Sequence, residues 1–504
     1  MLNVREDTST GLLLQDSLRP YSRKCLEENN EVTTRSAAPQ RTSNVREDAS
    51  TGLLLQDSLR PCSRKCLEEN NEVTTRSAAP QRTSNVREDA STGLLLQDSL
   101  RPCSRKCLEE NNEVTTRSAA PQRTSNVRED ASTGLLLQDS LQTFSPFGIY
   151  IHWPFCLSKC PYCDFFSKVK KEDEQDKLID EYCKDLEFYA EMTGNRTVTS
   201  VFFGGGTPSL IKPENIEKLL DKISGCWKLS ADVEISLEAN PNTHTPTLFS
   251  DLKQAGINRL SLGVQALNDR DLKFLGRTHN AVQAVQSVKD IIQTFDNHSI
   301  DLIYALPGQN IQAWQNTLKQ AVSFGLKHIS LYQLTIEDGT VFAKKGIQAL
   351  DDEQAIKLYE YTNAFLAEAG YPRYEVSNYA SQKYQSRHNL IYWQGDDYLG
   401  IGPAAHGRLN VNGSCFATTY RRQQEQLTAG ERAQELIIMG LRLTEGINKI
   451  KFKRCCGIAL DDFINKKAAA TLIEDKLLEE TATCLRASEK GFAVLNKIIE
   501  ELCS

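Results

Sequence analysis

Long apolar runs and basic runs are both missing from the 504-residue sequence. No uninterrupted apolar stretch approaches the roughly 20 residues that span a bilayer, and the N-terminus lacks the basic-then-apolar pattern of a signal peptide. The formal net charge of −7 and the lack of a basic run disfavour a nucleic-acid partner, which would need a basic face. We therefore predict no transmembrane segment, no DNA or RNA role and a cytoplasmic location.

The first part of the chain has too few apolar residues to form a core. Residues 3–142 repeat with a period of 41, and Asn-Val-Arg-Glu-Asp begins at Asn3, Asn44, Asn85 and Asn126. Each unit contains only seven Leu or Val residues, which bury too little surface to offset the entropy of ordering the chain. We predict that residues 1–144 are disordered, and a stacked array of short helices is the alternative.

From Ser145 onward, short β-branched or aromatic runs alternate with amphipathic helical stretches, which is typical of consecutive β/α units. The pattern predicts six parallel strands near 148–152, 199–203, 231–237, 259–264, 299–305 and 328–333. It predicts helices over 176–192, 213–224, 245–256, 281–295 and 312–325, several of which end at glycine. We expect an α/β fold, a partial (β/α)6 barrel over 145–380, with chemistry at the C-terminal ends of its strands.

Three cysteines follow the first predicted strand within eight residues: Cys156, Cys160 and Cys163. Thiolates are soft ligands that suit iron and sulfide, and a [4Fe-4S] cube held by three of them keeps one iron free for a chelating cofactor. A structural zinc site is the alternative, but it would need a fourth Cys or His nearby, and Asp164 is a poor replacement. We therefore predict an iron-sulfur cluster, in a chain whose other cysteines stay reduced.

Polar residues and glycines at the ends of later strands form a candidate ligand site. The Gly-Gly-Gly-Thr-Pro segment at 204–208 allows a ligand to approach the backbone closely, although a tight turn alone would also need glycine. Glu238 ends the third strand, where it either binds a ligand or is a solvated carboxylate. Gln265, Arg277 and Asp301 complete the set, and a plain salt bridge between Arg277 and a carboxylate is the alternative.

The spacing C-x3-C-x2-C after a strand resembles the signature of the radical S-adenosylmethionine (SAM) superfamily. In that superfamily SAM chelates the fourth iron, and an electron from the cluster splits its sulfonium to give a 5′-deoxyadenosyl radical. From Tyr150 to about Gly407 the chain further resembles the oxygen-independent coproporphyrinogen III oxidase family, most closely its heme chaperone branch, HemW. The similarity lies in Tyr-Ile-His-Trp-Pro-Phe-Cys at 150–156, Gly-Gly-Gly-Thr-Pro-Ser at 204–209, Leu-Ser-Leu-Gly-Val-Gln at 260–265, Leu-Gly-Arg-Thr-His at 275–279, Asp-Leu-Ile-Tyr-Ala-Leu-Pro-Gly-Gln at 301–309 and Tyr-Glu-Val-Ser-Asn-Tyr-Ala at 374–380.

The resemblance implies roles for single residues. It assigns Tyr150, Gly205 and Glu238 to the cluster-bound SAM. In oxidases of the family, a second SAM is contacted at the positions of Tyr162, Gly206, Thr207, Gln265, Arg277 and Asp301. The chain departs from the oxidases because Asp164-Phe165 follows Cys163, where oxidases have a further cysteine, and because repeats replace their N-terminal segment.

The segment Arg387-His-Asn-Leu-Ile-Tyr-Trp393 resembles the His-Asn-x-x-Tyr-Trp motif of the heme chaperone branch. It makes His388 the leading candidate for contact with heme, ahead of His152 and His406, because a neutral imidazole can ligate heme iron. The aromatic pair that follows could pack on the macrocycle. A hydrogen-bonded histidine beside a core aromatic pair is the alternative.

The predicted function is that of a heme chaperone that binds a [4Fe-4S] cluster, SAM and heme and passes heme to acceptor hemoproteins, such as respiratory enzymes at the membrane. An electron donor such as a flavodoxin or a ferredoxin is implied. The alternatives are a coproporphyrinogen III oxidase or dehydrogenase of porphyrin biosynthesis, which the departures disfavour, and a radical SAM methyltransferase. Residues 381–504 are expected to form a HemW-type, winged-helix-like α+β region with a hairpin at 488–491, used for packing or partner contact.

Overall fold

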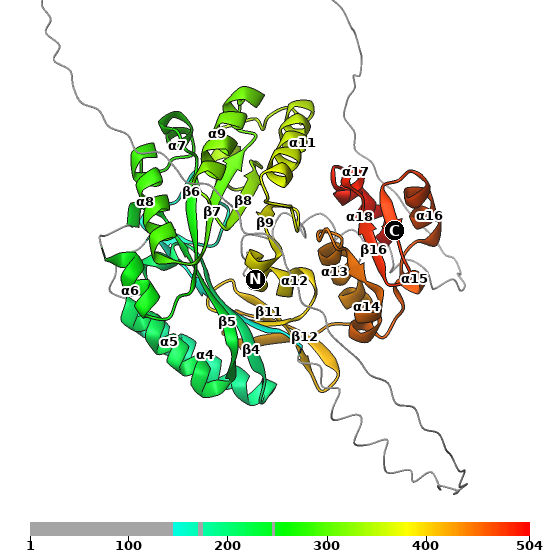
Figure 1. Ribbon diagram of the computed structural model, residues 1–504. Coiled ribbons are helices and arrows are strands. Elements are labelled where there is room, and N and C mark those ends of the chain that lie inside the picture. The colour runs from blue at the N-terminus through cyan, green and yellow to red at the C-terminus, as the bar shows by residue number, and fades with distance from the viewer. Residues whose placement is uncertain (1–144, 170–174, 244–246) are drawn as a thin grey trace, which may run out of the picture. The chain divides into compact units, whose positions relative to one another are not determined.

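The computed structural model describes residues 145–169, 175–243 and 247–504, all of which fall within one compact unit. The predicted disorder of residues 1–144 lies outside the described residues. A single sheet in the order β13-β12-β11-β10-β1-β4-β5-β6-β7-β8-β9 dominates the fold (Figure 1). Its parallel part is the curved sheet of a partial barrel.

The six predicted strands are all present and run parallel to one another. Each observed strand contains its predicted range or differs from it by one residue at an end. Their bounds are β1 Phe147–Trp153, β4 Thr197–Gly205, β5 Lys228–Ala239, β6 Arg259–Gln265, β7 Asn297–Tyr304 and β8 His328–Gln333. The predicted α/β barrel class is therefore confirmed.

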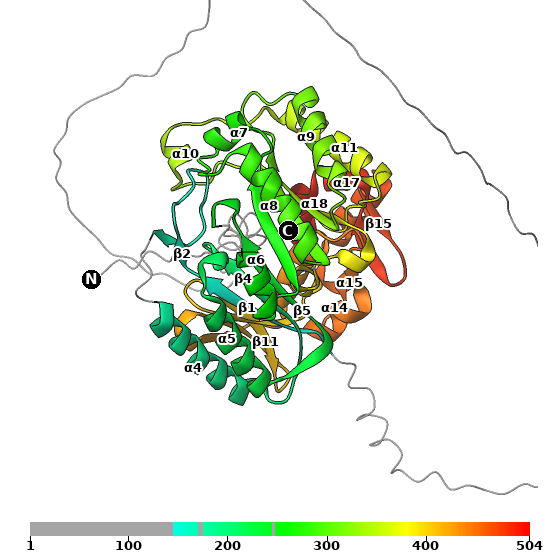
Figure 2. The same cartoon turned by 60° about the vertical axis from the view of Figure 1, so that its left-hand side comes forward.

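Helices cover the outer face of this sheet, as Figures 1 and 2 show. Those that connect the strands are α4 Gln175–Thr193, α5 Pro213–Cys226, α6 Leu248–Gln254, α7 Asp269–Phe274, α8 Ala281–Thr294 and α9 Ile311–Ser323. They are followed by α10 Val341–Lys344 and α11 Asp352–Glu368. Helix α8 illustrates why these helices begin where they do: Asn280 and Gln283 form a capping box at its N-terminus.

The two faces of the barrel strands differ in chemistry, because successive side chains of a strand point to opposite faces. The outward residues of β1, β4 and β5, such as Ile149, Val201 and Leu237, belong to the main apolar core. The alternate residues on β5 to β8 are polar and buried, and include Glu234, Arg259, Ser261, Ser299, Asp301 and His328. The concave side of the barrel is thus built to hold polar chemistry.

A seventh parallel strand, β10 Asp397–Ile401, was not predicted and pairs with β1. It is only five residues long and joins the sheet beside the first strand after a long crossover, which a local sequence pattern does not reveal. The antiparallel strands β11 His406–Val411, β12 Ser414–Thr419 and β13 Gln423–Gln426 extend the sheet beyond it, while β9 Asn378–Ala380 pairs antiparallel with β8. The sheet therefore continues past residue 380, the predicted end of the barrel.

Between β9 and β10 the short helix α12, Arg387–Trp393, contacts β1 and β4. The rest of the C-terminal region has its own apolar core, from Ala433 to Leu502. Its helices are α13 Ala429–Gly440, α14 Lys449–Cys456, α15 Leu460–Phe463, α16 Lys466–Glu474, α17 Glu489–Phe492 and α18 Leu495–Cys503. Its small antiparallel sheet consists of β14 Ile447–Asn448, β16 Cys484–Ala487 and β15 Leu478–Glu480.

This mixture of helices and one hairpin agrees with the predicted α+β region, but the predicted hairpin position at 488–491 is wrong. The hairpin joins β15 to β16, and Ser488 instead caps α17 by accepting a hydrogen bond from the N–H of Gly491. Serine followed by an acidic residue is a helix start, and this signal outweighs the turn propensity of the glycine.

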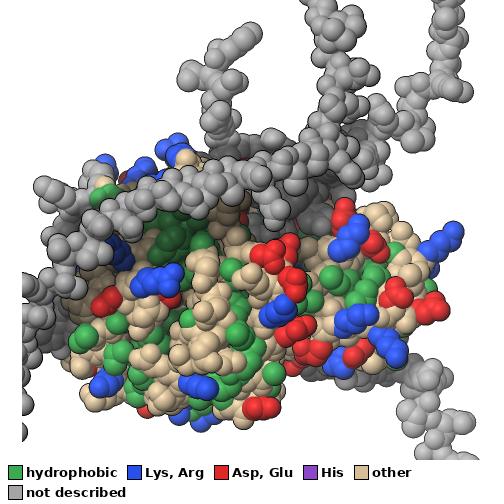
Figure 3. All heavy atoms as spheres, turned by 90° about the horizontal axis from the view of Figure 1, so that it is seen from above, with side chains coloured by type: hydrophobic (Ala, Val, Ile, Leu, Met, Phe, Trp, Pro, Cys, Tyr) green, Lys and Arg blue, Asp and Glu red, His purple; other side chains and the backbone are tan. Residues whose placement is uncertain are grey.

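Among the residues that the structure describes, no helix combines the length and apolarity needed to cross a membrane. On the face shown in Figure 3, acidic and basic side chains are interspersed rather than separated into fields of one sign.

Candidate functional site

A cavity of about 190 Å³ lies at the C-terminal ends of the barrel strands. Eleven of the thirteen predicted site residues line it. They are Cys156, Cys160, Tyr162, Cys163, Gly205, Gly206, Thr207, Glu238, Gln265, Arg277 and Asp301. Residues far apart in the chain meet here because parallel strands deliver their carboxyl ends to one edge.

The cysteine loop is held against the glycine segment that follows β4. The N–H of Gly206 donates to the carbonyl of Trp153 at 2.6 Å, and the N–H of Thr207 donates to that of Phe155 at 2.9 Å. A Cβ at Gly206 would lie 2.6 Å from the Phe155 carbonyl oxygen, so no larger residue fits there. Gly205 has a φ of +107°, which also favours glycine. The glycines therefore both fix the loop and line the cavity.

Arg277 ties one predicted cluster ligand to the cavity wall. Its guanidinium donates to Cys160 Sγ at 3.4 Å, to the carbonyl of Gly263 at 2.8 Å and to the side-chain oxygen of Asn240. The salt bridge to a carboxylate that the sequence left open is not among the described contacts of Arg277. Donation to sulfur places a fixed positive charge beside the thiol group.

Glu238 and Asp301 are two acids on the inner face of β5 and β7. Burial, reinforced by the charge of Asp301, raises the pKa of Glu238 to about 8. Burial also raises the pKa of Asp301, although a hydrogen bond from Ser261 at 3.0 Å opposes this shift. Glu238 Oε2 accepts from the N–H of Gly205 at 3.3 Å. Both carboxyl groups line the cavity and can accept hydrogen bonds from a polar or cationic ligand.

The donor set fits an iron-sulfur cluster better than a single metal ion. None of the ten cysteines among the described residues forms a disulfide, so the three in the loop are available as metal ligands. Within that same part of the chain, no three His, Cys, Asp or Glu side chains are gathered around one point as a mononuclear site requires. The ligands of a cube bind three different irons and stand farther apart, and a row of thiols without an imidazole or carboxylate is the ligand set of such clusters.

Tyr150, predicted to contact SAM, lies behind the cavity rather than in its lining. Its hydroxyl is 3.1 Å from His152 Nδ1, and a Cβ at Gly204 would lie 2.8 Å from its ring. Burial, followed by the nearby charge of Glu238, raises its pKa. His152 Nε2 in turn approaches the carbonyl of Phe166 at 3.0 Å. Tyr150 is thus linked through His152 to the segment after the cysteine loop.

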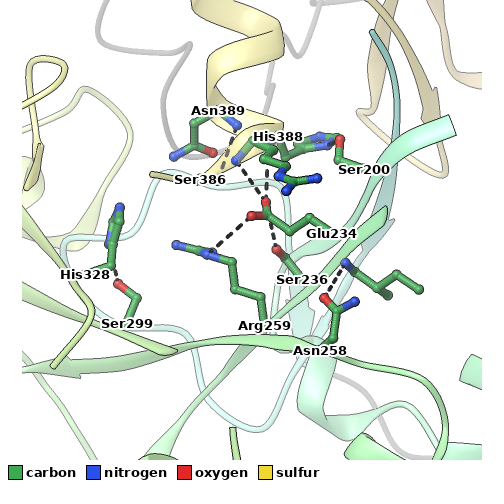
Figure 4. A network of polar contacts seen from close by, with 12 residues as sticks. Ser200, Glu234, Ser236, Asn258, Arg259, Ser299, His328, Ser386, His388 and Asn389 are labelled. Atoms are coloured by element: carbon green, nitrogen blue, oxygen red, sulfur yellow. Dashed lines mark hydrogen bonds and ion pairs between the residues drawn. The ribbon is translucent and has the colours of Figure 1, made fainter. Parts of the chain in front are cut away.

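His388, predicted to contact heme, is buried beside Ser200 and Glu234 (Figure 4) and does not line the cavity. It is 1% exposed, with Nδ1 2.8 Å from Ser200 Oγ and Nε2 2.6 Å from the hydroxyl of Tyr392. Burial lowers its pKa to about 3, so it is neutral. Contact between His388 and a heme iron therefore remains a prediction, and it requires the loss of one of these hydrogen bonds. His406, ranked lower, begins β11 and is also held neutral by burial, which lowers its pKa to about 4.

Part of the cavity lining was not predicted from the sequence. Asn240 follows Glu238 by two residues, and Tyr332, Gln333, Thr335 and Glu337 follow from the end of β8. The signal was available, because β8 was predicted to end near 333 and the residues after barrel strands gather at one rim.

Two sequence families match the chain. The radical SAM superfamily matches residues 150–321, and the HemN C-terminal domain matches residues 427–494. The first span runs from β1 into α9 and includes the cysteine loop, and the second covers most of the C-terminal region.

Among curated proteins, the chain is similar to the heme chaperone HemW of Buchnera aphidicola, with 36% identity over 372 residues, which is 71% of this chain and 98% of the relative. It is also 34% identical, over 71% of its length and 87% of the relative, to the mitochondrial radical S-adenosyl methionine domain-containing protein 1 of Bos taurus. Among solved structures, coproporphyrinogen III oxidase (HemN) of Escherichia coli matches with a TM-score of 0.61 and 21% identity, over 74% of this chain and 93% of that one.

Proposed function

Because this chain belongs to the HemW family of heme chaperones within the radical SAM superfamily, we propose that it carries heme and passes it to acceptor hemoproteins. The observation that carries the proposal is the length of the match, since 98% of a heme chaperone aligns with this chain at 36% identity. The likeness to the oxidase, at 21% identity, concerns the fold alone. The proposed partners are acceptor hemoproteins at the respiratory membrane.

The cavity is the proposed site of a [4Fe-4S] cluster and SAM. Cys156, Cys160 and Cys163 would hold the cluster, which supplies one electron and an open iron for SAM when bound. Gly205 and Glu238 would face the amino and ribose donors of SAM, and a cationic ligand would offset the burial that raises the pKa of Glu238 to about 8. Gln265, Arg277, Asp301, Gly206, Thr207 and Tyr162 line the remaining space, where a second SAM would lie.

The electron donor would dock beside the cysteine loop. Strands β2 Phe155–Cys156 and β3 Lys168–Val169 pair so that Cys156 lies beside Val169. Leu157 and Val169 are 55% and 63% exposed, and the exposed Lys159 and Lys168 flank them. An apolar centre between lysines suits a small acidic carrier such as a flavodoxin or a ferredoxin. Charge reversal at both lysines should slow cluster reduction, whereas Lys289→Glu on α8 should not.

The cytoplasm is the compartment that we assign. The competing compartment is the mitochondrial matrix, because the similar bovine protein is named mitochondrial. Fractionation of cells that express the full chain with a C-terminal tag distinguishes the two, and recovery with mitochondria would overturn the assignment.

An anaerobic heme titration and a coproporphyrinogen assay on the same reconstituted protein test the function. We expect a stoichiometric Soret band, transfer of that heme to the apo form of a b-type cytochrome, and no release of carbon dioxide from coproporphyrinogen with SAM and reductant. Decarboxylation in the absence of heme transfer would identify an oxidase instead. Transfer of labelled methyl groups from SAM to a product would identify a methyltransferase.

A further inference from the structure

Helix α12 presents its motif residues to two different places. His388 and Tyr392 are one helical turn apart and bond to each other inside the barrel, where His388 also stacks on Phe202 at 5.2 Å. Trp393 packs on the other side, with Met439 and Leu443 of the C-terminal region. On the barrel side these side chains are engaged by hydrogen bonds and ring stacking, whereas Trp393 borders open space on the other side.

A cleft of about 390 Å³ is present on that side, within the size range of cofactor sites. Its apolar wall is buried and comes from the end of α12, from α13, from the loop after it, from β14 and from α14. The wall residues are Trp393, Leu436, Leu443, Ile447 and Phe452. The Nε1 of Trp393 has no hydrogen-bond partner, so the indole is not committed to a polar contact with the surrounding protein.

The rim of the cleft is polar and carries a thiol. Gln394, Glu445, Asn448, Lys451 and Thr483 line it, together with Cys484 at the start of β16. Cys484 is partly exposed, and its Sγ donates to the carbonyl of Glu445 at 2.8 Å. Lys451 is 2.7 Å from Asp396 and faces the same opening. An apolar wall, a cation and a soft iron ligand thus surround one space.

We propose that this cleft is the site of the cargo heme, with Cys484 as the iron ligand, an inference that rests on the proposed function. A flat apolar macrocycle fits between aromatic and aliphatic side chains, and its carboxylates fit donors such as Lys451 and Asn448 at the opening. Ligation by the thiolate releases the thiol proton to solvent and leaves the Glu445 carbonyl without that donor. His388 is a positioning residue here, because its bonds to Ser200 and Tyr392 hold the helix that forms one wall.

The test is an anaerobic titration of the full chain, loaded with cluster and SAM, with ferric heme. We expect Cys484→Ser to weaken binding at least tenfold and to abolish the Soret and EPR signature of thiolate-ligated ferric heme. Thr483→Trp, at the exposed rim, should weaken binding to a similar degree by filling the opening. The matched control is Ala482→Trp, an exposed neighbour that does not line the cleft, and it should bind as wild type. His388→Ala should weaken binding while the thiolate signature persists.

The outcomes separate this inference from the function on which it rests. If wild-type protein binds heme, and both Cys484→Ser and Thr483→Trp bind it with unchanged affinity and spectrum, the cleft is not the site. If the iron-ligand spectrum is lost in His388→Ala but not in the other variants, the heme binds on the barrel face of α12 instead. If wild-type protein binds no heme at all, the proposed function falls and the cleft assignment falls with it.

Discussion

Arg277 is the residue through which the protein acts most directly on the predicted cluster. Its guanidinium reaches Cys160 Sγ, Asn240 and the carbonyl of Gly263 at once, and lysine cannot reproduce this fork. Hydrogen bonds to cluster sulfurs raise the reduction potential. We expect Arg277→Lys to shift the potential to a more negative value and to weaken SAM binding about tenfold, through loss of about 1.4 kcal/mol. Anaerobic potentiometry with EPR detection measures the first effect.

The control for this prediction is Arg270→Lys on α7, because Arg270 is exposed and keeps the same change of side chain away from the cavity. Equal potentials in the two variants would contradict a role for the Arg277–Cys160 contact.

Burial of His388 is expected to make the free energy of unfolding depend on pH. Its pKa is lowered by burial to about 3 in the folded protein, against 6.5 for an ordinary histidine, so the folded state keeps it neutral. Below pH 6.5 the unfolded chain takes up a proton that the folded chain refuses, and stability falls as the pH decreases toward 3. Between pH 7.5 and pH 5.0 this single residue costs about 2 kcal/mol. His388→Gln should flatten the decline by that amount in urea unfolding, compared in the same cluster state. An unchanged slope would mean that His388 is not neutral in the fold.

Single residues differ in how far the sequence determines their place. The cysteines, glycines and strand-end polar residues were predicted to meet because the motif and the alternation of strands and helices both place them at one rim. Tyr150 and His388 carry equally good motif resemblance, yet they point into the barrel interior. A motif names residue types, but it does not say which side of a short helix such as α12 faces a ligand.

At the scale of elements, α12 depends on a buried carboxylate from another strand. Glu234 on β5 accepts hydrogen bonds from the backbone N–H groups of Arg387 at 3.0 Å and His388 at 3.3 Å, as Figure 4 shows for His388. The same carboxylate lies 4.0 Å from the buried Arg259. A negative charge at a helix N-terminus is stabilising, and its loss would leave the arginine uncompensated.

Glu234→Gln should therefore destabilise the protein by about 3 kcal/mol and accelerate hydrogen exchange of the α12 amides. The matched control is Glu214→Gln on α5, where the glutamate is exposed and little change is expected. Hydrogen-exchange mass spectrometry with urea unfolding measures both. Equal stability of the two variants would mean that α12 is held by its apolar contacts alone.

The elements that the sequence missed are those defined by distant partners. Predicted strands have strong local alternation and a helix on either side, whereas β10 is short and owes its place to parallel pairing with β1. The hairpin of the C-terminal region was misplaced because the glycine at 491 was taken for a turn, although it lies in the first turn of α17 behind the Ser488 cap. Capping by a side chain is a local signal and could have corrected this prediction.

At the scale of the whole molecule, the sheet, the cavity and the second core all lie in the described part of the chain after residue 144. The sheet begins at β1, the cavity is lined by residues 156–337, and the second core ends at Leu502. A heme chaperone of Buchnera aphidicola is matched over 98% of its length by 71% of this chain. The 41-residue repeats are thus additional to the part of the chain that resembles the relative.

Stepwise removal of residues 1–43, 1–84, 1–125 and 1–142 tests this division, because each step deletes further repeat sequence and leaves the barrel strands intact. We expect iron and sulfide content, SAM affinity and thermal stability to stay level along the series, since no cavity residue or core residue is lost. Residues 427–504 provide the contrasting deletion, which removes most of the second core and all but two residues of the proposed heme cleft, Trp393 and Gln394. That deletion should abolish heme binding while cluster content persists. A progressive loss of iron as repeats are removed would instead make the extension part of the structure that holds the cluster.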